Sequence, residues 1–182
     1  MQVTPRPTRV PWIAIGLLSG TALAYEVLLT RIFAIVHWHH LVAIAISLAL
    51  LGYGASGTFM VFAGNVLRRR LPAAFVANAL LFSVSTVLCV MLAQQITFDP
   101  QAVAWQPDEI VRLAGSFLLL AIPFFAAANC IGLVFWHFEQ QIPRIYGVDL
   151  LGAGIGALAL LWGLSLWRPD ALLIGVMGGG LL

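Results

Sequence analysis

Residues 12–36 read WIAIGLLSGTALAYEVLLTRIFAIV, an apolar run in which Glu26 and Arg31 are the charged residues. As a helix rising about 1.5 Å per residue, this run is roughly 37 Å long, which exceeds the roughly 30 Å hydrocarbon core of a bilayer. A secretory signal would have a shorter, uncharged apolar part, followed by a small-residue cleavage site before the next apolar segment. The run therefore predicts a first membrane-spanning helix that crosses with some tilt.

The composition of the whole chain also indicates a membrane protein. Of its 182 residues, 62% are hydrophobic and 9% are charged, and the mean hydropathy is +1.00. Because a soluble domain carries about 25% charged residues, this composition excludes a soluble globule, a disordered chain and a coiled coil. The formal net charge is only +2 and the basic residues lie in short flanks, so we expect no nucleic-acid partner.

Further apolar runs follow the first one, separated by polar segments. We expect complete spans at 12–36, 41–63, 73–93, 112–138 and 148–167, with an incomplete sixth segment at 171–182. This last segment is too short to cross a bilayer. The end within a helix favours a fragment of a longer protein over a protein that consists of the membrane part alone. The predicted fold class is an all-α polytopic membrane helix bundle with five complete spans and a truncated sixth.

The segments between the spans have distinct characters. We expect an N-terminal tail at 1–11, a basic turn at 64–72 that contains the arginines at 68–70, and an acidic surface loop at 94–111. Pro123 is expected to kink the fourth helix, because proline removes one helical hydrogen bond.

The distribution of arginines predicts the orientation of the chain in the membrane. Arginines on one side of the predicted spans are Arg6, Arg9, Arg68, Arg69, Arg70 and Arg144, whereas Arg112 and Arg168 lie on the other side. Positively charged loops stay in the cytoplasm. We therefore expect a multi-pass protein of a bacterial-type plasma (inner) membrane with a cytoplasmic N-terminus.

Glycines at four-residue spacing occur in three of the apolar segments. The pairs are Gly16/Gly20, Gly152/Gly156 and Gly175/Gly179. Such pairs let helices approach closely, and their spacing does not fit the G-x-G-x-x-G loop of a nucleotide site. The cysteines, Cys89 and Cys130, fall at different depths of their spans, so we expect two buried free thiols without a disulfide.

Three segments resemble one family of membrane proteins. Residues 19–31, SGTALAYEVLLTR, look like the first-helix signature of membrane-bound spermidine synthase-like proteins, and residues 47–57, SLALLGYGASG, are similar to their second helix. Residues 143–156, PRIYGVDLLGAGIG, resemble the motif at the start of a later helix of that family, with Tyr146, Asp149, Gly152 and Gly156 at its characteristic positions.

This resemblance implies an activity for a longer protein. Members of the family join a multispanning N-terminal region to a soluble Rossmann-like domain, which binds S-adenosylmethionine or its decarboxylated form and transfers a methyl or an aminopropyl group. The cofactor-binding and catalytic residues belong to that later domain, so no catalytic residue can be placed in the 182 residues. The resemblance implies an integral membrane domain that anchors the transferase domain and feeds substrate to it.

Polar groups at membrane depth are the strongest candidates for a functional site. In the first span, Glu26 lies roughly 3 Å and Arg31 roughly 10 Å outward of the midplane, at 1.5 Å per residue. Ionisable residues at such depths cost at least about 2.5 kcal/mol each, so they must face protein or water. We interpret Glu26, Arg31 and Asn129 as a candidate site for protons or a substrate. In a purely structural alternative, Arg31 extends to the interface and Glu26 bonds a polar residue of another helix (Ser47, Ser56 or Asn129).

Residues 37–40, HWHH, form a second candidate site. If the helix continues through them, His37 and His40 share a face, and their imidazoles could ligate a metal or a tetrapyrrole. No carboxylate or thiolate lies nearby in sequence as a third ligand. The alternative is a group of interfacial histidines beside Trp38.

A function of a different class is also open, namely that of a non-catalytic accessory subunit in a larger membrane complex. Its glycine-rich helix faces would then pack on partner helices. On either hypothesis, the expected partners are the lipid bilayer and the helices of other membrane subunits or of a second copy.

Overall fold

The computed structural model describes residues 10–36, 42–95, 107–166 and 169–181. They form α1 (Trp12–Val36), α2 (Val42–Arg69), α3 (Leu71–Gln95), α4 (Pro107–His137), the 3-10 helix η2 (Glu139–Gln141), α5 (Ile142–Leu166) and α6 (Pro169–Leu181). The five helices α1 to α5 are long and apolar enough to cross a membrane, and the described residues contain no strand. The predicted fold class, an all-α polytopic membrane helix bundle, is confirmed.

Prolines occupy the first turn of α3, α4, α5 and α6. They are Pro72, Pro107, Pro143 and Pro169, each at the first or second position of its helix. Proline is tolerated there because the first N–H groups of a helix have no intrahelical acceptor. These helices therefore begin before the predicted positions 73, 112, 148 and 171. The last residues of the expected 94–111 loop belong to α4, whereas residues 96–106 lie outside the described ranges.

The second helix extends beyond its apolar stretch. α2 continues to Arg69 instead of ending at 63, and only Arg70 separates it from α3. Backbone hydrogen bonds from Arg70 N to Leu67 O (3.1 Å) and from Ala74 N to Arg70 O (2.9 Å) stabilise this connection. The turn expected at 64–72 is thus mostly helix, because helical hydrogen bonds do not require apolar side chains.

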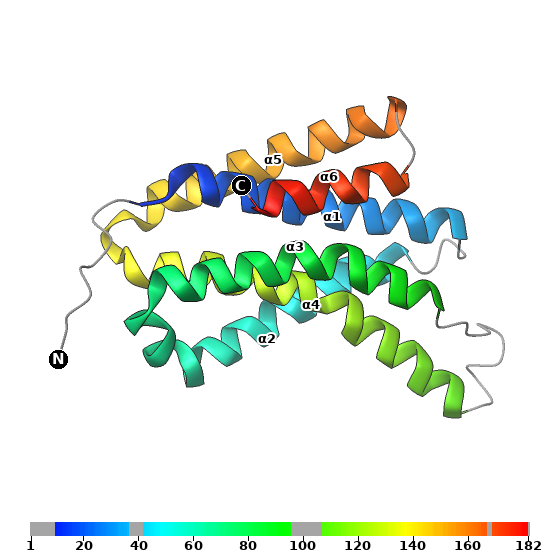
Figure 1. Ribbon diagram of the computed structural model, residues 1–182, viewed down its shortest axis with the longest axis horizontal. Coiled ribbons are helices and arrows are strands. Elements are labelled where there is room, and N and C mark those ends of the chain that lie inside the picture. The colour runs from blue at the N-terminus through cyan, green and yellow to red at the C-terminus, as the bar shows by residue number, and fades with distance from the viewer. Residues whose placement is uncertain (1–9, 37–41, 96–106, 167–168, 182) are drawn as a thin grey trace.

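Successive helices run in opposite directions (Figure 1). The start of α1, the α2–α3 turn and η2 lie at one end of the bundle, on the left of Figure 1, and the start of α4 lies at the other end. Along the bundle, α5 packs on α1, both α2 and α3 pack on α4, and α6 lies against α1 and α3. α4 changes direction along its length (Figure 1), and Pro123 lies inside it, as the predicted kink requires.

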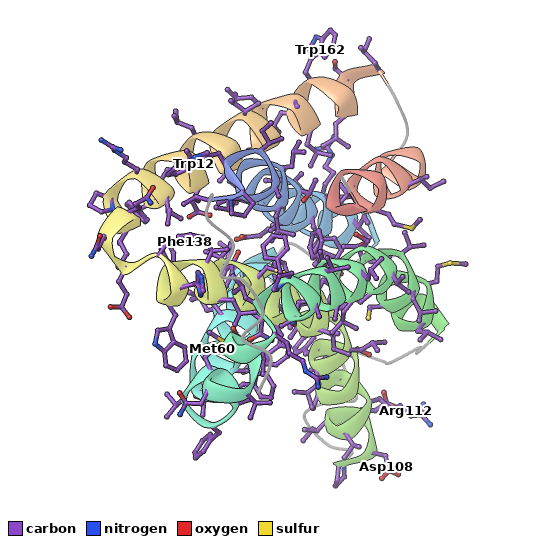
Figure 2. All side chains as sticks on the ribbon, turned by 60° about the vertical axis from the view of Figure 1, so that its left-hand side comes forward. Trp12, Met60, Asp108, Arg112, Phe138 and Trp162 are labelled. Carbon is purple, nitrogen blue, oxygen red and sulfur yellow. The ribbon has the colours of Figure 1, made fainter. Side chains whose placement is uncertain are left out.

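The core of the bundle lies between α1, α3 and α4, whereas α5 is peripheral. The rings of Tyr25 and Phe124 pack with their centroids 5.2 Å apart, and both side chains are fully buried. In α5, the buried side chains are Ile145 and Leu160, and Trp162 points away from the bundle (Figure 2). The outer surface of α5 is therefore suited to contact lipid tails.

Candidate functional site

A cavity of about 800 Å³ lies between α1, α2, α4 and α5. Its polar lining consists of carboxylates and hydroxyls, and its apolar lining includes aromatic and small side chains. The polar residues are Ser19 and Glu26 of α1, Tyr53 and Ser56 of α2, Glu139 of η2 and Asp149 of α5. α2 and α5 make no extensive contact with each other within the described chain, so the cavity is open between these two helices.

Small residues leave this space unfilled. Ser56 and Gly57 of α2 and Gly132 of α4 contribute little side-chain volume to the walls. A Cβ added at Gly132 would approach the Met60 side chain at 3.6 Å, and one added at Gly57 would meet no atom within 4 Å. The hollow therefore follows from the choice of residues on α2 and α4.

The cavity extends from the interior of the bundle to one of its ends. Glu26 lies within the first membrane span, whereas Glu139 follows the end of α4. Along α4, the lining runs from Ala128 to Trp136, a rise of roughly 12 Å at 1.5 Å per residue. The end that it reaches is the one that carries the α2–α3 turn (Figure 1). A bound molecule could therefore extend from membrane depth to this end of the bundle.

A hydrogen bond joins the α1 and α5 walls of the cavity. The Ser19 hydroxyl donates to Oδ1 of Asp149 and also lies 2.8 Å from the carbonyl oxygen of Ile15. Ser19 is buried, and Asp149 is partly exposed. It holds the Asp149 carboxylate at the cavity wall within the fifth span.

Glycines let α1 and α5 approach closely enough for this bond. A Cβ added at Gly152 would lie 2.6 Å from the Gly16 Cα, and one at Gly20 would lie 2.8 Å from the Gly152 carbonyl oxygen. Gly156 packs equally closely on Gly20. The predicted pairs Gly16/Gly20 and Gly152/Gly156 thus face each other in one interface, as such motifs do in membranes.

In the third glycine pair, Gly175/Gly179, one glycine packs closely on another helix and the other does not. A Cβ at Gly179 would lie 2.5 Å from the Thr21 Cγ2, so Gly179 is needed where α6 meets α1. Gly175 has no atom within 4 Å of such a Cβ. The expected Gly175/Gly179 contact is therefore a contact of Gly179 alone.

Glu26 lines the cavity without a hydrogen bond or ion pair to any residue in the described part of the chain. The Tyr53 side chain lines the same cavity as Glu26 and Asp149. Ser56 and Asn129, which the structural alternative offers as partners of Glu26, instead bond each other. The Glu26 carboxylate is therefore available to a bound molecule or to water.

Asn129 is the centre of a polar network behind the cavity wall. The Ser56 hydroxyl donates to Asn129 Oδ1 at 2.7 Å, and Asn129 Nδ2 donates to Asn78 Oδ1 at 3.2 Å. Asn78 Nδ2 then donates to the Ala74 carbonyl oxygen at 2.8 Å. The network links α2, α4 and α3, and Asn129 is fully buried.

The candidate residues from the sequence are separated by the fold. Glu26 lines the cavity, Asn129 reaches it only through Ser56, and Arg31 is exposed and does not line it. His37 and His40 lie outside the described residues. Within the described part of the chain, no group of three His, Cys, Asp or Glu side chains could hold a metal ion.

The residues of the motif at 143–156 also lie in different parts of the structure. Asp149 lines the cavity, Gly152 and Gly156 lie in the α1–α5 interface, and Tyr146 is 53% exposed. The two thiols, Cys89 and Cys130, are buried and free, which confirms that they do not form a disulfide.

The sequence alone did not identify Tyr53, Phe135 and Trp136 as residues of a cavity. Tyr53 and Ser56 are three residues apart on α2 and share a face, and Phe135 and Trp136 lie near the end of α4. Their helical spacing is visible in the sequence. Their convergence with α1 and α5 is not, because it depends on which helices pack together.

The three segments 19–31, 47–57 and 143–156 meet at this cavity. Residues 19–31 contribute Ser19 and Glu26, residues 47–57 contribute Tyr53, and residues 143–156 contribute Asp149. These segments are distant in sequence, so their convergence is a property of the folded chain. In comparisons with known proteins, no family model, no curated protein and no solved structure matches the chain.

Proposed function

We propose that this chain is the membrane domain of a spermidine synthase-like or methyltransferase-like protein, and that its cavity holds a substrate at membrane depth. The domain anchors a soluble transferase domain and delivers the substrate to it. S-adenosylmethionine or its decarboxylated form would bind to the transferase domain and not to these helices.

The observation that supports this proposal is the convergence of the three resembling segments on one cavity with two carboxylates, Glu26 and Asp149. An ionisable residue within a membrane span is costly, and such residues mark substrate or ion pathways. Two of them at one cavity therefore favour a binding function over simple anchoring.

The direction of the cavity supports delivery to the cytoplasm. The cavity extends to the end of the bundle that carries the α2–α3 turn and η2. Arg70 and Arg144 belong to that end, and positive loops stay in the cytoplasm. We place this end, with the N-terminus, on the cytoplasmic side of a bacterial-type inner membrane, where a soluble transferase domain would receive the substrate.

The gene sequence beyond Leu182 and a transfer assay test this proposal. We expect the reading frame to continue into a G-x-G-x-x-G motif after a strand. Membranes that contain the full-length protein should then transfer label from S-adenosylmethionine, or from its decarboxylated form, into a lipid extract. Glu26→Gln should abolish most of this transfer, and Asp108→Asn, which changes a carboxylate outside the cavity, should not. A stop codon at this point, or transfer that is insensitive to Glu26→Gln, would refute the proposal.

The accessory-subunit alternative is favoured by the outer face of α5. This helix exposes large apolar side chains along its length, among them Leu151, Leu158 and Trp162. If a partner helix covers this face, a charged substitution such as Leu158→Arg should release a co-purifying subunit from the complex. If lipid covers the face, the purified protein should contain this chain alone.

A further inference from the structure

We propose that the ligand of the cavity is a lipophilic amine, with its protonated head between Glu26 and Asp149 and its apolar chain directed along α4 or into the bilayer. This inference rests on the proposed function, because it names the substrate class of the same cavity.

The charged residue types that line the cavity are acidic. Among the described residues, its carboxyl groups are those of Glu26, Glu139 and Asp149, and none of its described lining residues is an arginine or a histidine. The ion pair recorded in the described chain, Arg112–Glu109, lies elsewhere on α4. Carboxylates within a span are stabilised by a cation. A cation is therefore the ligand that complements these carboxyl groups.

The walls match an organic cation better than a metal ion. The cavity volume of about 800 Å³ lies within the range of roughly 300–1,000 Å³ that is typical of small-molecule sites. The described residues offer no three-ligand group for a metal. Tyr53, Phe135 and Trp136 provide aromatic rings, which attract ammonium groups through their negative faces, and Met60 and Ile131 provide apolar contacts.

The two carboxylates at membrane depth, Glu26 and Asp149, differ in their hydrogen bonding. Asp149 is positioned by the Ser19 hydroxyl, whereas Glu26 has no hydrogen-bond or ion-pair partner in the described chain. One acceptor is therefore fixed in advance and the other is free to close on a bound ammonium group. Such an arrangement reduces the ordering that binding requires.

The opening of the cavity favours an amphiphile over a fully water-soluble amine. α2 and α5 are separated at the cavity, and Val61 of α2 and Ile142 of α5 are exposed at its walls. These residues lie within candidate membrane spans, so the opening lies at membrane depth. An alkyl chain can enter sideways from the bilayer while its ammonium head reaches the carboxylates.

Binding of tritiated decylamine to the purified protein in phosphatidylcholine nanodiscs tests the inference. We expect saturable binding above that of empty nanodiscs, displaced by unlabelled decylamine but not by the neutral 1-decanol. Glu26→Gln and Asp149→Asn keep the shape of each side chain but remove its charge, and each should weaken binding by about tenfold or more. Asp108→Asn is the matched control, because Asp108 lies at the far end of α4 from Phe138 (Figure 2). This variant should bind decylamine with the affinity of the wild type.

Several outcomes would overturn the inference. They are the absence of saturable binding, equal displacement by 1-decanol, and unchanged affinity in Glu26→Gln. Size-exclusion profiles and helical circular dichroism establish that each variant is folded. If Asp149→Asn fails to fold, the Glu26→Gln result decides alone.

The transfer assay separates this inference from the proposed function. Amine binding that depends on Glu26, in a protein without group transfer, supports the inference and refutes the function. Transfer that depends on Glu26, without amine binding, supports the function and refutes the inference.

Discussion

The hydroxyl of Ser19 on α1 donates a hydrogen bond to Asp149 on α5, across 130 residues of sequence. Around this bond, the two helices touch through glycines and their backbones come close together. The bond fixes the register of the interface and also places a carboxylate at the cavity. The same contact therefore contributes to the packing of α5 and to the chemistry of the candidate site.

Breaking this bond should weaken the attachment of α5. We expect a double-mutant cycle of Ser19→Ala and Asp149→Ala to give a coupling free energy of about 1 kcal/mol, typical of interhelical hydrogen bonds in membranes. Unfolding in mixed micelles with increasing sodium dodecyl sulfate would measure it. Ser165→Ala is the control, because the Ser165 hydroxyl bonds only the Trp162 carbonyl oxygen of its own helix. Additive single effects would contradict the prediction.

The glycine interface should not tolerate side chains. Gly156→Val introduces atoms where the backbone of Gly20 lies, and we expect it to lower the free energy of unfolding by about 1–3 kcal/mol, as overpacking does. Gly154→Val changes the same helix by the same residue at a position with no atom within 4 Å. The same unfolding titration should therefore separate the two variants. Equal losses would mean that helix propensity, and not the α1–α5 contact, causes the effect.

The sequence predicted the fold class because apolar runs of sufficient length have few alternatives in a bilayer. It predicted helix ends less well. Hydropathy marks where side chains leave the apolar region, whereas α2 continues to Arg69 and α5 begins at Ile142 because the helical hydrogen bonds continue. Pro72 and Pro143, which lie outside the predicted spans, are compatible with first turns.

The candidate site was predicted only in part. Glu26 is visible in the sequence as a carboxylate within an apolar run, and Asp149 as part of a motif. Their meeting with Tyr53 depends on the pairing of α1 with α5 and on the gap beside α2. Helix pairing depends on interlocking surfaces, which a single sequence does not reveal. For the same reason, the expected partnership of Glu26 with Ser56 or Asn129 is not found.

The network centred on Asn129 should contribute to stability. Asn129→Ala removes the acceptor of the Ser56 hydroxyl and the donor to Asn78, so we expect a loss of about 1–2 kcal/mol in the free energy of unfolding. Asn65→Ala, at an exposed position of α2, is the matched control and should leave the unfolding curve unchanged. An Asn129→Ala protein with wild-type stability would show that the freed groups find other partners.

The orientation of the bundle can be read by cysteine labelling. After replacement of Cys89 and Cys130 by alanine, a single cysteine replaces either Asp108, near the start of α4, or Gln140, in η2 just beyond the end of α4; both residues are exposed. We expect a membrane-impermeant maleimide to label position 108 in intact cells and position 140 only after permeabilisation, because the arginine-rich end stays in the cytoplasm. The reverse pattern would invert the proposed topology.

Finally, substitutions of Glu26 should separate binding from stability. The Glu26 carboxyl group has no hydrogen-bond partner in the described chain and lines an open cavity, so its removal breaks no hydrogen bond or ion pair of the described residues. We therefore expect both Glu26→Gln and Glu26→Ala to unfold within about 0.5 kcal/mol of the wild type, as substitutions away from such bonds usually do. Glutamine should nevertheless weaken amine binding by about tenfold or more and remove most of the transfer, because the ligand site needs the charge and not the shape. If Glu26→Ala instead loses as much stability as Asn129→Ala while Glu26→Gln does not, then the side chain hydrogen-bonds a neighbouring helix. Glu26 would in that case be a structural residue, and the case for a cation site would rest on Asp149 alone.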